Sequence, residues 1–381
     1  MKRWLCLTLL VCAVPRTIAQ PPPAHELRGI FLTTTNSLDW PPSFDTQEQQ
    51  ATLRTMLADM KRAHLNAVFF QVRARGDAYY RSRYEPWAEN LTGKLGADPG
   101  WDPLQFLLEE AHAVGIEVHA WFNVYKIRGP VPPPASSPQH PARAFPQWVV
   151  QYDNELWLDP GLPPVRRYLI DVLSDLVDNY DLDAVCFDFI RYPGKDFPDA
   201  DTYQRYGNGA PRDQWRRYNI NAFVREAQAA VSRRKPHLKL GAAPLGNYGG
   251  PLSAQPFTRT TGGSVEDFLQ DARAWVKNRW LDYLVPQVYW TIEFETQGPD
   301  FSHLVRSWRR AAEGRHIYVG IGAYKPEVAQ QIPDQITASR MLGTEGQVFF
   351  RYEHVRSMRV FGDRYNSPAA TPPMPWKRQR D

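Results

Sequence analysis

The chain has 381 residues, of which 43% are hydrophobic and 23% are charged, as is typical of a globular protein with one large domain or two modest ones. The leader contributes Lys2, Arg3 and Arg16 to the formal net charge of +4. The rest of the chain is therefore nearly neutral and lacks the excess positive charge that attracts nucleic acid. The 13 Trp and 18 Tyr are a surplus of flat rings that suits core packing or stacking on sugars.

The N-terminus is typical of an export signal. Lys2 and Arg3 precede an apolar segment over residues 4–14, and the small residue Ala19 follows where a signal peptidase could cut. We expect residues 1–19 to be a signal peptide, residues 20–25 a proline-rich linker, and the protein to be periplasmic or secreted. An uncleaved anchor is an alternative. Lipid attachment at Cys12 is less favoured, because the bulky Val11 precedes that cysteine where a lipoprotein signal has a small residue.

From residue 26 to residue 360, short apolar segments alternate with longer amphipathic ones. The expected strands are Leu27–Thr33, Ala67–Arg73, Glu117–Asn123, Leu182–Asp188, Leu238–Pro244, Tyr283–Tyr289, His316–Ala323 and Gly346–Arg351. The expected helices are Thr46–His64, Asp102–Val114, Val165–Tyr180, Asp213–Arg234, Val265–Asn278, Ser302–Glu313 and Asp334–Leu342. Such alternation predicts an α/β fold, a (β/α)8 TIM barrel over residues 26–360. A doubly wound open sheet uses the same alternation, but no glycine-rich phosphate motif follows the first strand.

The C-terminal segment, residues 361–381, is rich in proline and ends in the basic run Lys377-Arg-Gln-Arg380. Its composition predicts a disordered tail. Such a tail could associate loosely with anionic polymers of the cell envelope.

Polar and aromatic residues gather where the expected strands end, and in a TIM barrel the active site is built at these strand ends. The fourth strand ends at Asp188, and an acid at the end of a long apolar segment needs a reason. Side chains two residues apart share a face of a strand. Gln71 and Arg73 are therefore expected on one face, as are Gln287 and Tyr289.

Six ordered motifs between Glu26 and Glu353 resemble the glycosyl hydrolase-like 10 family. They are Leu27-Arg-Gly-Ile-Phe-Leu-Thr33, Phe70-Gln-Val-Arg73 with Gly76-Asp77, His119-Ala-Trp-Phe-Asn123, Trp157-Leu-Asp-Pro-Gly161, Tyr180-Asp-Leu-Asp183 through Tyr192-Pro193, and Val285-Pro-Gln-Val-Tyr-Trp290. The resemblance implies a TIM barrel and an exported bacterial hydrolase acting on peptidoglycan glycan strands. One departure is Phe189, which stands where many relatives have a second aspartate.

Glycoside hydrolysis usually needs two carboxyl groups. Asp188 is the first candidate, and Arg191 nearby would favour its ionised form. Glu293, beyond the aromatic end of the sixth strand, is the candidate for the second, where an aromatic surround would suit an acid. Its competitors are Glu295, Asp159, Asp77 and Glu353.

The expected substrate-binding residues offer planar cations, amides and rings. Arg73 could hold a carboxylate such as the lactyl group of muramic acid, amides can donate to and accept from sugar hydroxyls, and rings can stack on a pyranose. The set is Arg73, Asn123, Asp159, Arg191, Gln287, Tyr289, Trp290 and Tyr324. No pair of His or Cys has metal-ligand spacing, so neither a metal nor a cofactor is expected.

The sequence thus predicts an exported glycoside hydrolase that binds a polysaccharide or a peptidoglycan glycan strand. Two alternatives stay open: a carbohydrate-binding barrel without turnover, and an esterase or deacetylase acting on the same sugars.

Overall fold

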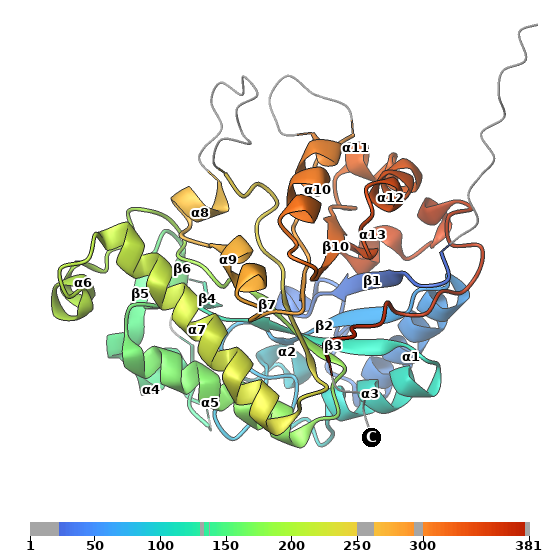
Figure 1. The fold of residues 1–381 in the computed structure, drawn as a ribbon. Helices are drawn as coiled ribbons and strands as arrows, with labels where there is room; N and C mark the ends of the chain where they lie inside the picture. Colours follow the sequence, from blue (N-terminus) through green and yellow to red (C-terminus); the bar gives the residue numbers. More distant parts are fainter. Residues whose placement is uncertain (1–22, 130–132, 137, 250–262, 293–299, 378–381) are drawn as a thin grey trace, which may run out of the picture.

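The computed structural model describes residues 23–129, 133–136, 138–249, 263–292 and 300–377. In this part of the chain, eight parallel strands close into a barrel (Figure 1). Around the barrel they are β1 (Leu27–Leu32), β2 (Ala67–Arg73), β3 (Glu117–Asn123), β7 (Ala184–Asp188), β8 (Lys239–Ala242), β9 (Tyr283–Leu284), β10 (His316–Ile321) and β11 (Gly346–Phe349). Because β11 pairs with β1, the sheet has no open edge. The predicted TIM barrel is confirmed.

Helices follow the strands and cover the outside of the barrel. The longer ones are α1 (Thr46–Arg62), α3 (Pro103–Ala113), α5 (Pro163–Asn179), α7 (Arg212–Arg234), α10 (Phe301–Arg310) and α12 (Ile332–Met341). The shorter ones are α2 (Glu89–Thr92), α4 (Pro141–Ala144), α6 (Ala200–Tyr206), α8 (Ser264–Asp267), α9 (Ala272–Lys277), α11 (Pro326–Ala329) and α13 (Tyr352–Val355). Single 3₁₀ turns occupy Thr35–Ser37, Pro146–Trp148 and Arg359–Phe361. None of the described helices is both long enough and apolar enough to cross a membrane.

The helix starts follow local chemistry. The Asp102 side chain accepts a hydrogen bond from the Gln105 backbone N–H at the start of α3, and Pro103 occupies the first turn, as predicted. The helix expected over Val265–Asn278 is wrong in one respect, because it is broken into α8 and α9. Leu269 has a left-handed φ of 54° between them, and Asp271 caps the second piece.

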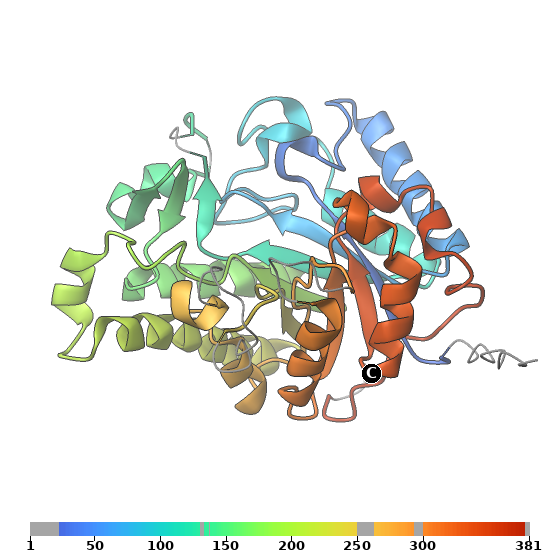
Figure 2. The same ribbon diagram turned by 90° about the horizontal axis from the view of Figure 1, so that it is seen from above.

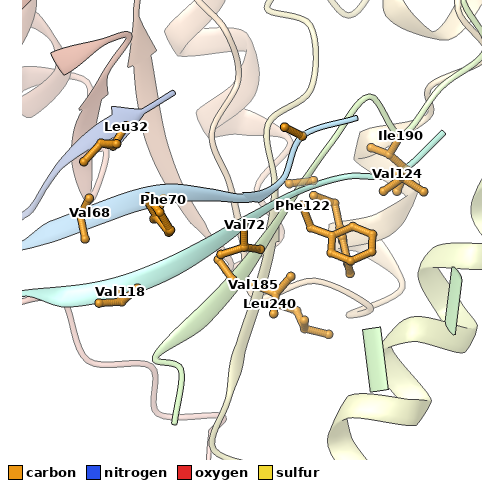
Figure 3. Packing of buried hydrophobic residues seen from close by; sticks show 14 of the residues in the cluster. Leu32, Val68, Phe70, Val72, Val118, Phe122, Val124, Val185, Ile190 and Leu240 are labelled. Carbon is orange, nitrogen blue, oxygen red and sulfur yellow. The ribbon is translucent and has the colours of Figure 1, made fainter. Parts of the chain in front are cut away.

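Alternation along the strands separates two layers of side chains. Ala184 and Cys186 of β7 belong to the cluster inside the barrel, whereas Val185 and Phe187 belong to the cluster between strands and helices. Figure 3 shows this outer cluster, in which residues of β2, β3 and β7 lie close together. By the same alternation, Asp188 lies on the inner face at the carboxyl end of β7.

The chain between β3 and α5 adds a small antiparallel sheet beside the barrel (Figure 2). Its strands are β4 (Lys126–Arg128), β5 (Val149–Tyr152) and β6 (Glu155–Leu158), with β6 in the middle. β4 begins three residues after β3 ends, and the Leu158 N–H donates to the Tyr125 carbonyl at 2.8 Å. The inserted sheet is therefore tied directly to the barrel strand that precedes it.

The C-terminal tail differs from its predicted disorder. As far as Lys377 it packs across the amino-terminal ends of the strands, where Trp376 Nε1 donates to Asp282 and Lys377 Nζ pairs with the same carboxylate, each at 2.8 Å. Met374 is buried among the residues inside the barrel. The proline-rich composition gave no sign that this segment packs into the barrel through Met374 and makes specific polar contacts through Trp376 and Lys377. Lys377 is thus engaged in the fold, and residues 378–381 lie outside the described residues.

Candidate active site

A cavity of about 540 Å³ opens at the carboxyl ends of the strands, the end of a TIM barrel where active sites form. Its walls come from the ends of β1, β2, β3 and β7, from segments that follow β8, β9 and β11, and from the inserted sheet. Amide and aromatic side chains dominate: Asn36, Gln71, Asn123, Asn154 and Gln287, with Phe31, Trp121, Phe189, Tyr289 and Phe350. Its described charged residues are Arg75, Lys126, Arg128, Glu155, Asp188 and Arg191.

Asp188 lines this cavity from the end of β7. Burial raises the pKa of its carboxyl group to about 6, although the Phe189 backbone N–H and the Arg191 charge act in the opposite direction. The Phe189 N–H donates to Asp188 Oδ1 at 2.7 Å, and Gln287 Nε2 donates to the same oxygen at 3.4 Å. A carboxyl group with a pKa near neutrality can give or take a proton at physiological pH.

The residues after Asp188 form a cation–aromatic wall. Phe189 has a left-handed φ of 48°, and its ring contacts two cations, with Lys126 Nζ 4.8 Å and the Arg191 guanidinium carbon 5.5 Å from the ring centroid. Arg191 also lies 5.4 Å from the Trp157 ring centroid. Burial lowers the pKa of Arg191, while the charges of Asp188 and Glu155 raise it. Arg191 therefore lies at the cavity, within electrostatic reach of both acids.

Aromatic rings form the opposite side of the cavity. Tyr289 lies near-parallel to Phe350 with ring centroids 5.8 Å apart, and Tyr324 meets Tyr289 edge-on at 5.8 Å. Gly322 lies under Tyr289, where a Cβ would be 2.8 Å from the ring, so this strand end must be glycine for the ring to fit. Tyr289 and Gln287 line the cavity as predicted. Tyr324, 41% exposed, stands one ring away at the rim.

The prediction for Arg73 is wrong. Its guanidinium is fully buried, donates two hydrogen bonds to Glu85 at 2.7 and 2.6 Å, and packs over Phe122 on the outer face of the barrel. The cause is a bulge: Gln71 pairs with Trp121 and Arg73 with Phe122, so Val72 is an extra residue in β2. Gln71 keeps the inner face, Arg73 turns outward, and Arg75 lines the cavity instead.

Several lining residues hold polar atoms that are buried and have no hydrogen-bond partner in the described part of the chain. They are Thr33 Oγ1, Arg75 Nε, Trp121 Nε1, Asn123 Oδ1 and Arg128 Nη1. The Trp121 indole N–H is near enough to Asp188 to lower its pKa without meeting hydrogen-bond geometry. Buried polar groups are normally paired. Gathered around one cavity, these atoms are suited to a ligand with many hydroxyl or carboxylate groups.

Two other expected binding residues lie elsewhere. Asp159 is buried outside the cavity, accepts from the Gly161 N–H at 2.8 Å and from Thr202 Oγ1 at 2.6 Å, and its pKa is raised by burial. It shapes the turn before α5. Trp290 packs against the outer cluster, and its carbonyl accepts from Gln335. Successive residues of an extended segment point to opposite faces, which explains why Tyr289 faces the cavity and its neighbour does not.

The other acids considered for the second carboxyl group do not lie at the cavity or lie outside the described residues. Asp77 is buried and accepts from the Arg75 backbone N–H at 2.9 Å, and Glu353 pairs with Arg356 at 3.4 Å; neither lines the cavity. Glu293 and Glu295 lie outside the described residues. Of the described lining residues, Asp188 and Glu155 carry carboxyl groups.

Sequence reasoning missed Glu155, Lys126, Arg128 and Arg75. The first three belong to the inserted sheet, and their signal was position: Lys126 and Arg128 are two residues apart just after the third strand, and Glu155 opens the segment that contains Trp157. Within the described part of the chain, no three His, Cys, Asp or Glu side chains are grouped so as to hold a metal ion.

Comparison with known proteins agrees with this fold. The model of the family Glycosyl hydrolase-like 10 matches residues 26–337. The chain is 34% identical to glycosyl hydrolase YngK of Bacillus subtilis, over 98% of this chain and 78% of that protein. It is 32% identical to glycosyl hydrolase DigH of Escherichia coli K12, over 84% of this chain and 82% of that protein.

Solved structures show the same barrel at low sequence identity. The glycoside hydrolase domain of PgaB (BpsB) from Bordetella bronchiseptica is 18% identical with a TM-score of 0.62, covering 90% of this chain and 99% of that domain. The catalytic domain of β-amylase from Paenibacillus polymyxa is 14% identical with a TM-score of 0.56, covering 90% and 95%. From the family match and the identity to its curated relatives, the chain belongs to the Glycosyl hydrolase-like 10 family and is a glycoside hydrolase.

Proposed function

We propose that this glycoside hydrolase is exported to the cell envelope and cleaves glycosidic bonds in peptidoglycan-type or related amino-sugar glycans, with Asp188 as one of two catalytic carboxyl groups. The observation that carries the proposal is the set of unpartnered buried polar atoms around Asp188. Hydroxyl and amide groups of a sugar can pair with hydroxyl, indole and amide side chains of this kind.

Two of these buried polar atoms belong to guanidinium groups, and they indicate which kind of glycan the cavity binds. Arg75 Nε and Arg128 Nη1 are buried donors at the cavity wall that make no hydrogen bond, although Arg75 Nε lies 3.8 Å from Asp77 Oδ2 in an ion pair. Guanidinium N–H groups are well matched to carboxylates, and muramic acid in peptidoglycan carries a lactyl carboxylate. Arg75 and Arg128 are therefore the candidates for binding the lactyl carboxylate, a role that the sequence analysis had assigned to Arg73.

Asp188 is suited to protonate the leaving oxygen of a glycosidic bond. A carboxyl group whose pKa is raised to about 6 by burial is partly protonated near neutral pH and can act as a general acid. The sequence names Glu293 as the second carboxyl group, and this assignment stays a prediction. Export, and with it a periplasmic or secreted location, is supported by the basic and apolar leader of residues 1–19.

The experiment compares the purified chain with its Asp188→Asn variant on peptidoglycan glycan strands with stem peptides, on the same strands without them, and on neutral chitin oligosaccharides. New reducing ends are counted and products are identified by mass spectrometry. We expect the wild-type chain to cut the muramic acid strands and the variant to leave them intact. Cleavage restricted to the neutral oligosaccharides would refute the substrate class, and full activity in the variant would refute the role of Asp188.

The same assay separates the two alternatives from the proposal. Binding of glycan strands without new reducing ends would favour a carbohydrate-binding barrel. Acetate released from intact strands would favour an esterase or deacetylase.

A further inference from the structure

The inserted sheet carries a second acid to the active-site cavity. Glu155 is the first residue of β6 and follows the tight turn that joins β5 to β6, where Asp153 has a left-handed φ of 50°. Both Asn154 and Glu155 line the cavity. The β5–β6 hairpin therefore reaches over the same space into which β7 directs Asp188.

The hairpin is held firmly. β6 pairs with β4 on one side and β5 on the other, and β4 continues almost directly from β3. At the far end of β6 the Asp159 N–H donates to the Trp148 carbonyl at 2.9 Å. A catalytic group needs a rigid support of this kind, because small displacements of the reacting atoms reduce the rate strongly.

The Glu155 carboxylate is oriented by two donors. Lys126 Nζ forms an ion pair with Oε1, and Trp157 Nε1 donates to Oε2 at 3.1 Å. Its side chain is 35% exposed, so that water reaches it, whereas Asp188 is set deeper at the strand end. The surroundings of the two acids share residues: Lys126, which pairs with Glu155, contacts the Phe189 ring next to Asp188, and Arg191 interacts with the charges of both carboxylates.

We infer that Glu155 is the second carboxylate of the hydrolysis, the base that takes a proton from the attacking water while Asp188 protonates the leaving oxygen. This inference rests on the proposed function. The anomeric carbon–oxygen bond breaks as the Asp188 proton passes to the leaving oxygen. The water oxygen forms the new bond to the anomeric carbon, and its proton passes to Glu155. One water is consumed, and solvent exchange returns both carboxyl groups to their starting states.

The chain offers a matched control in Glu89. It pairs with the cavity residue Arg128 at 3.1 Å, and its side chain is 35% exposed, the same fraction as Glu155. Unlike Glu155 it does not line the cavity. A second control, Lys126→Met, tests whether Glu155 matters only because it positions the lysine.

The experiment measures kcat, KM and the pH profile of the full chain and of Glu155→Gln, Glu89→Gln and Lys126→Met on peptidoglycan glycan strands. We expect Glu155→Gln to lower kcat about 100-fold or more with a much smaller change in KM. Glu89→Gln should stay within a few-fold of wild type, and Lys126→Met should lose less than Glu155→Gln. The first product released by wild type should have inverted anomeric configuration, because a water-activating base gives inversion.

Three results would each overturn the assignment of Glu155 as the base. They are a near wild-type kcat in Glu155→Gln, a loss of kcat in Lys126→Met as large as in Glu155→Gln, and a first product with retained anomeric configuration. So would a Glu293→Gln variant that loses turnover while Glu155→Gln keeps it. Failure of the proposed function looks different: the wild-type chain would then leave these strands uncut, or Asp188→Asn would still cut them.

Discussion

Replacing Asp188 with Asn should make the protein more stable while abolishing its activity. Burial raises the pKa of Asp188 from 3.8 to about 6, so the ionised carboxylate is less favourable in the folded state than in the unfolded chain. A difference of about two pKa units, at about 1.4 kcal/mol each, is worth at most about 3 kcal/mol. Asn has no charge to bury, and its Oδ1 can still accept from the Phe189 N–H.

Because the pKa of Asp188 is higher in the folded state than in the unfolded chain, the stability difference between Asp188→Asn and wild type depends on pH in a defined way. Well below pH 4 Asp188 is protonated in both the folded and unfolded states, and the two proteins should then be equally stable. Between about pH 4 and 6 the unfolded chain ionises before the folded one, so the wild type loses stability relative to the variant. Above about pH 6 the difference should be constant and at its largest.

Urea unfolding at pH 4, 5, 6, 7 and 8 measures this difference directly. Asp171→Asn, at an exposed position of α5, is the control for replacing a carboxylate with an amide at the surface. Two results would refute the conclusion that burial raises the pKa of Asp188. One is a stability gain in Asp188→Asn that does not depend on pH, and the other is an Asp188→Asn variant less stable than wild type at pH 7.

Three further predictions concern activity and the fold. Asp188→Asn should lower kcat at least about 100-fold, and wild-type kcat should fall above about pH 6 as the acid ionises; a rate still rising at pH 8 would contradict this. Arg73→Ala leaves Glu85 buried without its partner, so the free energy of unfolding should fall by about 3–5 kcal/mol, and an unchanged urea midpoint would show that the pair is dispensable. Trp376→Ala should lower the free energy of unfolding by about 1–3 kcal/mol without altering KM, and a changed KM would mean that the tail acts on the site.

The barrel could be predicted because its strands are buried on both faces and stand out as apolar segments. Seven of the eight expected strands start and end within about two residues of the observed ones. The exception worth explaining is β9, expected to reach Tyr289 but regular only over Tyr283–Leu284. Pro286 has no N–H to give to the ladder, and beyond it Gln287 makes only isolated bridges to Leu245 and Gly320.

The site could be predicted only where strand alternation holds. Asp188, Asn123, Gln287 and Tyr289 lie at the inner face as expected. At β2 a single extra residue turned Arg73 to the outer face, and a shift of one residue always reverses which face a side chain occupies. No periodicity in the sequence marks a bulge of this kind.

Glu155 lay beyond any argument from strand ends, because the inserted sheet that carries it is short and only partly buried. Composition also misled at the tail, where Trp376 and Lys377 are fixed by Asp282, a residue distant in sequence. Both cases depend on tertiary contacts between segments whose local sequence is compatible with a loop.

Asp188 links the stability and the chemistry of this barrel. The alternation that directs Ala184 and Cys186 into the apolar interior continues one step to place a carboxyl group just above that interior, where burial raises its pKa. If a polar environment solvated the Asp188 carboxylate, the free-energy cost of burying its charge would disappear. The pKa of Asp188 would then return to its ordinary value, and the group would be ionised near neutral pH and unable to act as an acid. The expected stabilisation in Asp188→Asn and its loss of turnover therefore have the same physical origin.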